Sequence, residues 1–249
     1  MSMIPQNDVL PEFLANYQGK TGSEELSGGD LAFPFLAIGQ AMNPKVQAGD
    51  APLGSIFCPT TGEILADSKE KPIAFYPFIF WKVFIKWGER GDNTMMAIEP
   101  PGGEGERSVR AREKITRLNG KTDFIWTQYN NYGVVIDGRN DWFVLSCYRT
   151  NIRSSRHFNS MIERKPRIGA QRSPIFAWRY TVETRLEKNQ AGQYFIYHFD
   201  NAGIIKDQTL FEQLRVLNEE ITRVKDSISM ASVAQESSET PSGGEQVPF

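Results

Sequence analysis

Residues 73–87 form the most aromatic and apolar stretch of the chain, and they constrain the fold more than any other segment. The stretch is shorter than the about 20 apolar residues that a membrane-spanning helix needs, and lysines interrupt it. After Pro77 its pattern has the period of two that is typical of a β-strand. One face of this strand should lie in the core, because it is uniformly apolar and carries Ile79, Trp81, Val83, Ile85 and Trp87.

The opposite face of the same strand is mixed and carries Phe78, Phe80, Lys82, Phe84 and Lys86. Rings that alternate with cations suit a single-stranded nucleic acid, because bases stack on rings while phosphates pair with Lys or Arg. The face would also suit the core if the lysine stems lay along the rings and only their ammonium groups reached water. This stretch alone leaves both interpretations open.

Most of the remaining chain is predicted to form strands. Apolar runs bounded by turn residues indicate strands at 31–42, 124–129, 132–137, 142–148, 176–184 and 194–199, and a hairpin at 54–65. Asn130-Asn131 is predicted to separate two of these strands.

Helices are predicted at three places. The charged segment 108–118 is one candidate, and it follows a Gly-rich loop. A second helix is predicted to begin at Ser154 or Ser155, whose hydroxyl would cap it, and to end before Pro166. The clearest helix is 207–228, where apolar residues recur at three- and four-residue spacing. Asp207 would be its N-cap.

These elements predict a mainly β fold with one or two helices: an OB-like β-barrel core, a C-terminal helix and a disordered C-terminal tail. The strand count also fits a sandwich. The predicted order is a flexible N-terminal arm at 1–30, a β-rich nucleic-acid-binding domain at 31–206, a C-terminal helix at 207–230 and a disordered acidic tail at 231–249.

Charge is distributed unevenly, although the formal net charge is only -2. Residues 149–185 hold nine Lys or Arg and two acids, whereas residues 226–249 hold four acids and no Lys or Arg. Cations at this density offset phosphate charge, and aromatic residues alternate with them along the chain. The candidate DNA contacts are Phe80, Lys82, Lys86, Trp126, Tyr129, Arg149, Arg153, Arg156, Arg164, Lys165, Arg167, Arg172 and Arg179.

Catalysis and metal binding are not indicated. Cys58, Cys147, His157 and His198 show neither Cys-x-x-Cys nor His-x-x-x-His spacing, and each cysteine is best interpreted as buried and inert. Two distant cysteines also favour a reducing compartment. We therefore expect no enzymatic activity, no metal and no cofactor, and a cytoplasmic location without membrane association.

The C-terminus resembles that of bacterial and phage single-stranded-DNA-binding proteins, which commonly end in an acidic, disordered tail with a hydrophobic tip. Here a Ser- and Gly-rich linker without lysine ends in Glu245-Gln246 followed by Val247, Pro248 and Phe249. The resemblance covers about the last twenty residues, and no run of Asp precedes the tip. It implies that Val247, Pro248 and Phe249 bind replication or recombination proteins, and that the tail competes with DNA for a basic surface.

The body of the chain is similar to a family of uncharacterised tailed-phage proteins. The shared features are the segment 41–50, the segment 54–65, an aromatic strand ending in Trp87, and an Arg-rich helix containing His157-Phe158-Asn159. This resemblance spans most of residues 33–200. It implies a phage origin, and hence the host cell cytoplasm as location, more firmly than it implies a function.

The leading hypothesis is a phage protein that coats and protects single-stranded DNA in replication or recombination and recruits partners by its C-terminal tip. One alternative is a single-strand annealing recombination protein, which would share the basic surface but assemble into rings, with the helix at 207–228 as a candidate oligomer contact. Another is a non-enzymatic virion or assembly protein that packs against its own copies and has no affinity for DNA.

Overall fold

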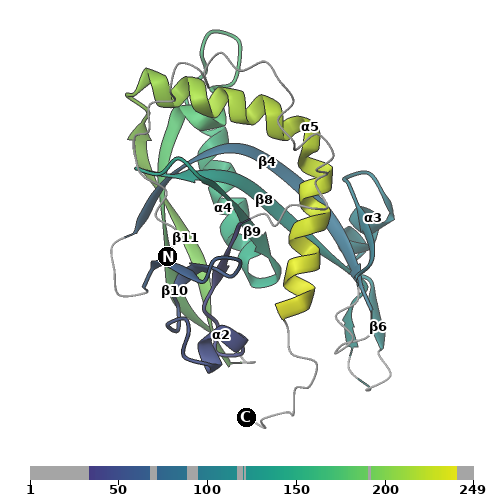
Figure 1. Cartoon of the computed structure of the whole chain (residues 1–249). Coiled ribbons are helices and arrows are strands. Elements are labelled where there is room, and N and C mark those ends of the chain that lie inside the picture. Colours follow the sequence, from purple (N-terminus) through teal and green to yellow (C-terminus); the bar gives the residue numbers. More distant parts are fainter. Residues whose placement is uncertain are drawn as a thin grey trace, which may run out of the picture.

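The computed structural model describes residues 34–67, 72–88, 95–116, 120, 122–189 and 192–239, with the backbone alone at 123, 224 and 226–239. The fold is mainly β, as predicted, and its large sheet curls strongly into a half-barrel (Figure 1). The predicted arm at 1–30 lies outside the described residues.

Nine strands form the large sheet, in the order β11-β10-β4-β8-β9-β1-β2-β3, with β5 also paired to β4. All pairs are antiparallel except β1 with β9. The bounds are β1 (Phe35–Ile38), β2 (Ile56–Cys58), β3 (Glu63–Ala66), β4 (Ile73–Trp87), β5 (Met95–Glu99), β8 (Trp126–Ile136), β9 (Trp142–Tyr148), β10 (Trp178–Asn189) and β11 (Gly192–Ile204). A separate small hairpin consists of β6 (Lys114–Thr116) and β7 (Thr122–Phe124).

Four α-helices complete the described structure. They are α2 (Pro44–Gln47), α3 (Glu104–Ala111), α4 (Ile152–Glu163) and α5 (Gln208–Glu239). Two short 3-10 helices, η2 (Arg149–Asn151) and η3 (Ile175–Ala177), precede α4 and β10.

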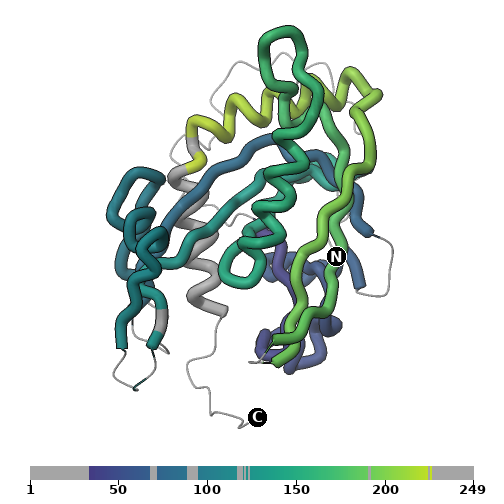
Figure 2. The backbone as a smooth tube through the Cα atoms, turned by 180° about the vertical axis from the view of Figure 1, so that it is seen from behind, coloured from purple at the N-terminus to yellow at the C-terminus, as the bar shows by residue number. Residues whose placement is uncertain are grey.

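Helices α4 and α5 cover opposite faces of the sheet, which we call the α4 face and the α5 face. Figure 1 shows α5 crossing in front of β4, whereas Figure 2, from behind, shows α4 inside the curl. On the α4 face, Phe158 of α4 packs among buried rings from β4, β8, β10 and β11. On the α5 face, Leu214 and Ile221 pack on the apolar side of β4. Each face therefore has its own hydrophobic core.

Strand β4 pairs with β5, β8 and β10. Its apolar side lies in the α5-face core as predicted: Ile79, Trp81, Val83 and Ile85 are buried there. The prediction for Phe78 is wrong, because this side chain is buried on the same face. The register with β8 shifts between Pro77 and Ile79. Pro77 has no N–H to donate to a ladder, and a bulge beside it brings two consecutive side chains to one face.

The half-barrel is closed by side chains rather than by a backbone ladder. The Gln40 amide donates to the carbonyl of Phe195 at 2.6 Å and accepts from the Phe195 N–H at 3.0 Å. Asn151 accepts from the Tyr197 N–H at 2.8 Å, and the Tyr197 hydroxyl donates to the Leu36 carbonyl at 3.1 Å. Among the described strands, β11 and β3 end the sheet, so these contacts protect the edge of β11 that faces β1.

Several predicted boundaries need correction. Helix α3 begins at Glu104, inside the predicted Gly-rich loop, and residues 114–116 are a strand instead of helix. Glu99 accounts for the early start, because its carboxylate accepts the N–H of Gly105 at 2.8 Å. Asn130-Asn131 does not separate two strands but lies within β8.

The ends of the other two predicted helices also differ from expectation. Neither Ser154 nor Ser155 caps α4, because the helix begins at Ile152 and both serines are buried within its first turns. Asp207 does cap α5, accepting from the N–H of Thr209 at 2.8 Å. The backbone of α5 continues to Glu239, into the segment assigned to the tail, and residues 240–249 with the predicted partner tip lie outside the described residues.

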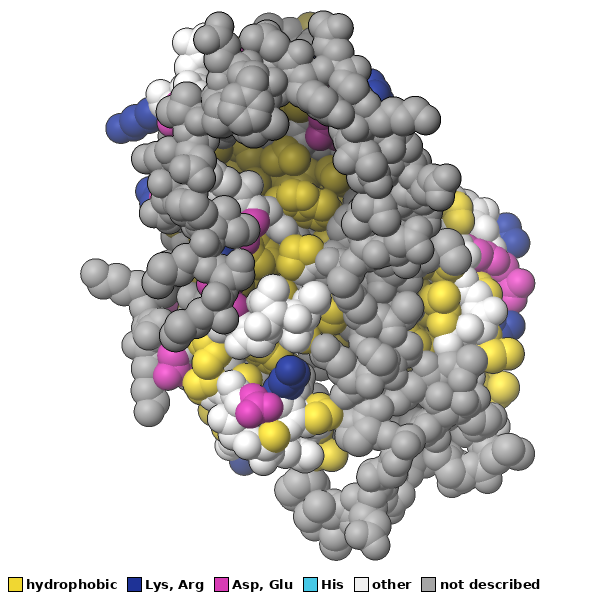
Figure 3. Space-filling view, in the orientation of Figure 1, with side chains coloured by type: hydrophobic (Ala, Val, Ile, Leu, Met, Phe, Trp, Pro, Cys, Tyr) yellow, Lys and Arg dark blue, Asp and Glu magenta, His cyan; other side chains and the backbone are white. Residues whose placement is uncertain are grey.

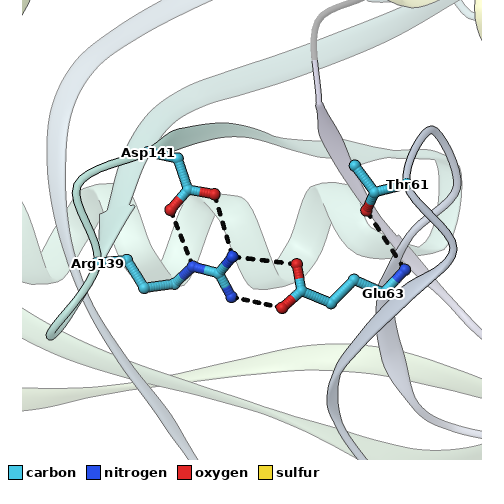
Figure 4. Close-up of polar contacts among 4 residues, drawn as sticks. All are labelled: Thr61, Glu63, Arg139 and Asp141. Atoms are coloured by element: carbon cyan, nitrogen blue, oxygen red, sulfur yellow. Dashed lines mark hydrogen bonds and ion pairs between the residues drawn. The ribbon is translucent and has the colours of Figure 1, made fainter. Parts of the chain in front are cut away.

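Arg139, between β8 and β9, joins two carboxylates from separate hairpins (Figure 4). Its guanidinium donates to Glu63 of β3 at 2.7 and 3.0 Å and to Asp141 at 2.9 and 3.1 Å. These hydrogen bonds raise the pKa of Arg139 above its usual range. The pairing fastens the β2–β3 hairpin to the β8–β9 turn.

We expect Arg139→Ala to lower the free energy of unfolding by about 1–2 kcal/mol, because a charge-assisted bidentate contact is lost while water screens a side chain that is 30% exposed. Arg139→Lys should recover less than half of the loss, since an ammonium cannot hold two carboxylates in the same plane. Urea titration checks both values, and full recovery by lysine would contradict the bidentate role.

Candidate nucleic-acid interface

The solvent face of α4 is basic. At about 100° per residue, Arg153, Arg156 and Arg164 lie on one side of the helix, together with His157 and Ser160. All five side chains are exposed, and we call them the α4 stripe. It runs about 16 Å along the helix axis at about 1.5 Å per residue. Within the described part of the chain, none of the three arginines forms an ion pair with a carboxylate.

The opposite side of α4 holds the stripe in place. Phe158 is fully buried, stacks on Phe199 at 4.5 Å between ring centroids, and meets Tyr180 edge to face at 4.9 Å. Tyr132 and Phe75 complete the ring cluster at 5.0 and 5.8 Å from Phe158. Rings at these separations attract one another beyond the burial of their area. The helix is therefore fixed to the sheet while its cations face solvent.

A second group of side chains lies on the α4 face of β4 and β8, and we call it the β4–β8 floor: Phe80, Lys82, Lys86 and Gln128. Phe80 is 37% exposed, and the other three are half-buried. The pairing of β4 with β8 shows where this floor lies. Phe80 pairs with Tyr132, which lies beneath α4, whereas Lys86 pairs with Trp126, which lies beneath α3.

Helix α3 closes the far end of this floor. A Cβ on Gly105 would come within 2.6 Å of the Phe84 Cβ and 2.8 Å of the Trp126 ring, so only glycine allows α3 to lie this close to the sheet. Lys86 lies over the Trp126 ring at 5.7 Å. A hydrogen bond from the Gly102 N–H, together with Arg110 and the nearby Lys82, lowers the pKa of Glu106 on α3.

Two predicted stacking rings are not accessible, which corrects the predicted site. Trp126 is only 3% exposed because α3 covers it, and Tyr129 is 4% exposed. Tyr129 belongs to the α5-face core and stacks on Tyr148 at 4.6 Å. Neither ring can take a base in this structure. Phe80 is the one ring of the predicted set that remains open to solvent.

The predicted cations outside the stripe and the floor fall into two groups: those that are exposed to solvent, and those whose charged group already contacts other side chains of the protein. Arg149 and Arg167 are exposed beyond the two ends of α4, and Arg149 also lies 6.0 Å from the Tyr148 ring. Arg172 pairs with Glu163 at 2.8 Å, and Arg179 pairs with Asp137. Lys165 lies over the rings of Trp178 and Tyr180 at 4.3 and 5.0 Å and donates to Asn201. The last three cations are already engaged within the protein.

The chain matches the model of one protein family over residues 5–225, which includes the α4 stripe and the β4–β8 floor. It belongs to the Pam3 phage gp34-like protein family. Membership supports the predicted phage origin but not specifically a role on single-stranded DNA. No curated protein and no solved structure matches the chain.

The matched region of the chain ends at residue 225, before most of the acidic C-terminal segment. The stripe, the floor and the helices that frame them thus lie within the part of the chain that defines the family. The resemblance of about the last twenty residues to single-strand-binding tails is a separate observation about this chain.

Substitution of Lys165 tests whether the cations that already contact other side chains also contribute to DNA binding. Burial against the rings lowers the pKa of Lys165, so its ammonium has already lost part of its water shell to the protein. We expect Lys165→Met to change the affinity for oligo(dT) by less than about threefold, because the lysine contacts rings instead of phosphate. Fluorescence anisotropy measures this, and a loss as large as that of Arg164→Ala would place Lys165 in the interface.

A polar network between β8 and α4 was missed by the sequence analysis. It consists of Gln128, Asn130, Tyr132, Ser155 and Asn159, linked by hydrogen bonds of 2.7 Å. Burial raises the pKa of the Tyr132 phenol, so its hydroxyl stays protonated and can donate. The available signal was a pair of asparagines inside an aromatic segment, since a buried amide needs partners.

Cys58 and Cys147 are both buried, as predicted, and burial raises the pKa of the Cys147 thiol. The described ranges contain no group of three or more His, Cys, Asp or Glu side chains placed to hold a metal ion. None of the described helices is long and apolar enough to cross a bilayer.

Proposed function

We propose that this phage protein binds single-stranded DNA in replication or recombination, in the host cytoplasm and without catalysing a reaction. The observation that carries the proposal is the α4 stripe, whose arginines have no carboxylate partner in the described structure and lie on the same face as the exposed ring of Phe80. Arginines that form no ion pair with a carboxylate favour phosphate, and a ring beside them favours an unpaired base.

The path of the bound DNA follows from the positions of the α4 stripe and the β4–β8 floor. Arg156 lies about 60° around α4 from Asn159, which is bonded to Tyr132 of β8, so Arg156 is on the side of the helix nearest the floor. A single strand of DNA lying along the stripe would pass from Arg156 to Lys82 and place a base over Phe80. By contrast, Figure 3 shows that hydrophobic side chains gather on the α5 side of the sheet.

The test is a titration of labelled oligo(dT) with the protein, followed by fluorescence anisotropy at several salt concentrations. Contacts from the three arginines of the α4 stripe and the two lysines of the β4–β8 floor to five phosphates predict a slope of log affinity against log salt of about -3.5, because each contact with a single strand contributes about -0.7. A duplex of equal length should bind at least about tenfold more weakly, since its bases cannot reach Phe80. Absence of binding at low salt would overturn the proposal and favour a virion or assembly protein.

The acidic C-terminus supports a further part of this proposal, recruitment of replication or recombination proteins by Val247, Pro248 and Phe249. Glu245 and the acids before it would compete with DNA for the stripe. We expect removal of residues 231–249, which hold Glu236, Glu239 and Glu245, to raise the affinity for oligo(dT) about two- to fivefold at low salt, and less at high salt. Unchanged affinity at every salt concentration would remove the tail from the DNA-binding surface.

A further inference from the structure

The hydrogen bonds between β8 and α4 form a chain in which each side chain donates to the next. Gln128 Nε2 donates to Asn130 Oδ1, and Asn130 Nδ2 donates to Ser155 Oγ. The Tyr132 hydroxyl has a single proton, which goes to Asn159 Oδ1 at 2.7 Å. Ser155 must then be the donor in its own 2.7 Å contact with the Tyr132 oxygen. The Ser155 carbonyl is a second acceptor for the Tyr132 hydroxyl, but at 3.4 Å it is farther than Asn159 Oδ1.

This direction fixes the orientation of the Asn159 amide. Its oxygen accepts from Tyr132 at 2.7 Å, and rotation of the amide would move the Tyr132 proton to Ser155 Oγ, whose own proton would then lose its acceptor, or to the Ser155 carbonyl at the longer distance of 3.4 Å. The Asn159 Nδ2 group has no acceptor among the described residues, and the side chain is half-buried. Asn159 therefore presents only donors to whatever lies beside it.

The surroundings of Asn159 are those of a base-binding position. Tyr132, which holds the amide, pairs with Phe80 across β8 and β4, and the two ring centroids are 5.0 Å apart. Phe80 is the exposed ring of the floor, Lys82 follows it on the same face of β4, and Arg156 lies one turn before Asn159. A ring for stacking, a fixed donor and two cations thus lie together.

We propose that Asn159 determines base specificity, selecting a base with a keto oxygen over one with an amino group at the same position. A base stacked on Phe80 would turn its edge toward the Asn159 Nδ2 donors. Thymine O4 and guanine O6 accept such a bond, whereas the amino groups of cytosine and adenine place a second donor there. This inference rests on the proposed single-strand binding, and it adds a preference for thymine over cytosine.

The experiment compares two matched oligonucleotides, oligo(dT) and its 5-methylcytosine counterpart, whose bases differ in the group at position 4 and in the proton at N3, which thymine carries and 5-methylcytosine lacks. Fluorescence anisotropy at slightly alkaline pH gives both affinities for the full-length protein. The wild type should prefer thymine by about three- to tenfold, as expected for one hydrogen bond that is gained or left unmade. The readout is the ratio of the two affinities, because charge changes alter both oligonucleotides equally.

Three variants separate specificity from general binding. Asn159→Asp keeps an acceptor for Tyr132 but presents an acceptor to the base, so the ratio should reverse in favour of 5-methylcytosine. Tyr132→Phe frees the amide to rotate, and the ratio should approach one. Gln213→Glu adds the same charge as Asn159→Asp on an exposed position of α5, on the other face of the sheet, and should leave the ratio unchanged. Urea titration confirms that each variant is folded.

Two results would overturn the inference in distinguishable ways. Tight binding of both oligonucleotides with a ratio that Asn159→Asp does not move would exclude Asn159 as the specificity determinant while leaving the proposed function intact. Absence of binding to either oligonucleotide at low salt would overturn both the proposed function and the inference.

Discussion

The triple variant Arg153→Ala, Arg156→Ala and Arg164→Ala should lose about 100-fold in affinity for oligo(dT) at low salt, and its salt slope should be flatter by about 2, since each lost phosphate contact removes about 0.7 from the slope. All three side chains are exposed on one side of α4, so their removal disturbs no packing. The variant should therefore unfold at the same urea concentration as the wild type. Anisotropy at several salt concentrations provides both numbers.

A matched control removes three arginines that already have carboxylate partners. Arg110 pairs with Glu106, Arg185 with Glu183, and Arg215 with both Glu212 and Glu219. Replacing these three with alanine changes the net charge by the same amount but should lower the affinity by less than about fivefold, through the long-range field alone. Equal losses in the two triple variants would mean that net charge, and not the α4 stripe, determines binding.

The sequence predicted the parts of the fold that depend on local pattern. The period of two identified the buried side of β4, and the three- and four-residue spacing identified α5 with its Asp207 cap. The density of arginines predicted a basic helix near residues 154–164, and the structure shows that three of them share one solvent face of α4. These features need only the geometry of one element, so one sequence is enough to find them.

The sequence could not show which rings stay open to solvent. Phe80 and Trp126 both lie on the same mixed face, yet α3 covers Trp126 and leaves Phe80 exposed. That difference depends on Gly105, which lets a helix approach two strands distant in sequence. Lys165 is a similar case, since its two rings come from β10. The change of sheet face at Phe78 could have been predicted from the sequence, because a proline inside a strand is itself a signal of a bulge.

Substitution of two phenylalanines distinguishes the packing that holds the interface in place from the contact with DNA. Phe158 belongs to the packing, and Phe80 is the proposed contact. Phe158 is fully buried at the centre of the ring cluster beneath α4, and a large cavity would follow its loss. Phe80 contributes one ring contact to Tyr132 and is partly open to water. Truncation of Phe158 should therefore act on folding, and truncation of Phe80 on binding.

We expect Phe158→Ala to lower the free energy of unfolding by about 3–5 kcal/mol, a large part of the about 5–15 kcal/mol typical of a folded domain. Phe80→Ala should cost about 1 kcal/mol or less in stability but reduce the affinity for oligo(dT) about tenfold, the value of one stacked base. Urea titration with an unchanged m-value measures the first effect, and anisotropy the second. If Phe80→Ala lost stability and retained its affinity, Phe80 would belong to the core, and the α4 stripe would bind the strand without a stacking ring.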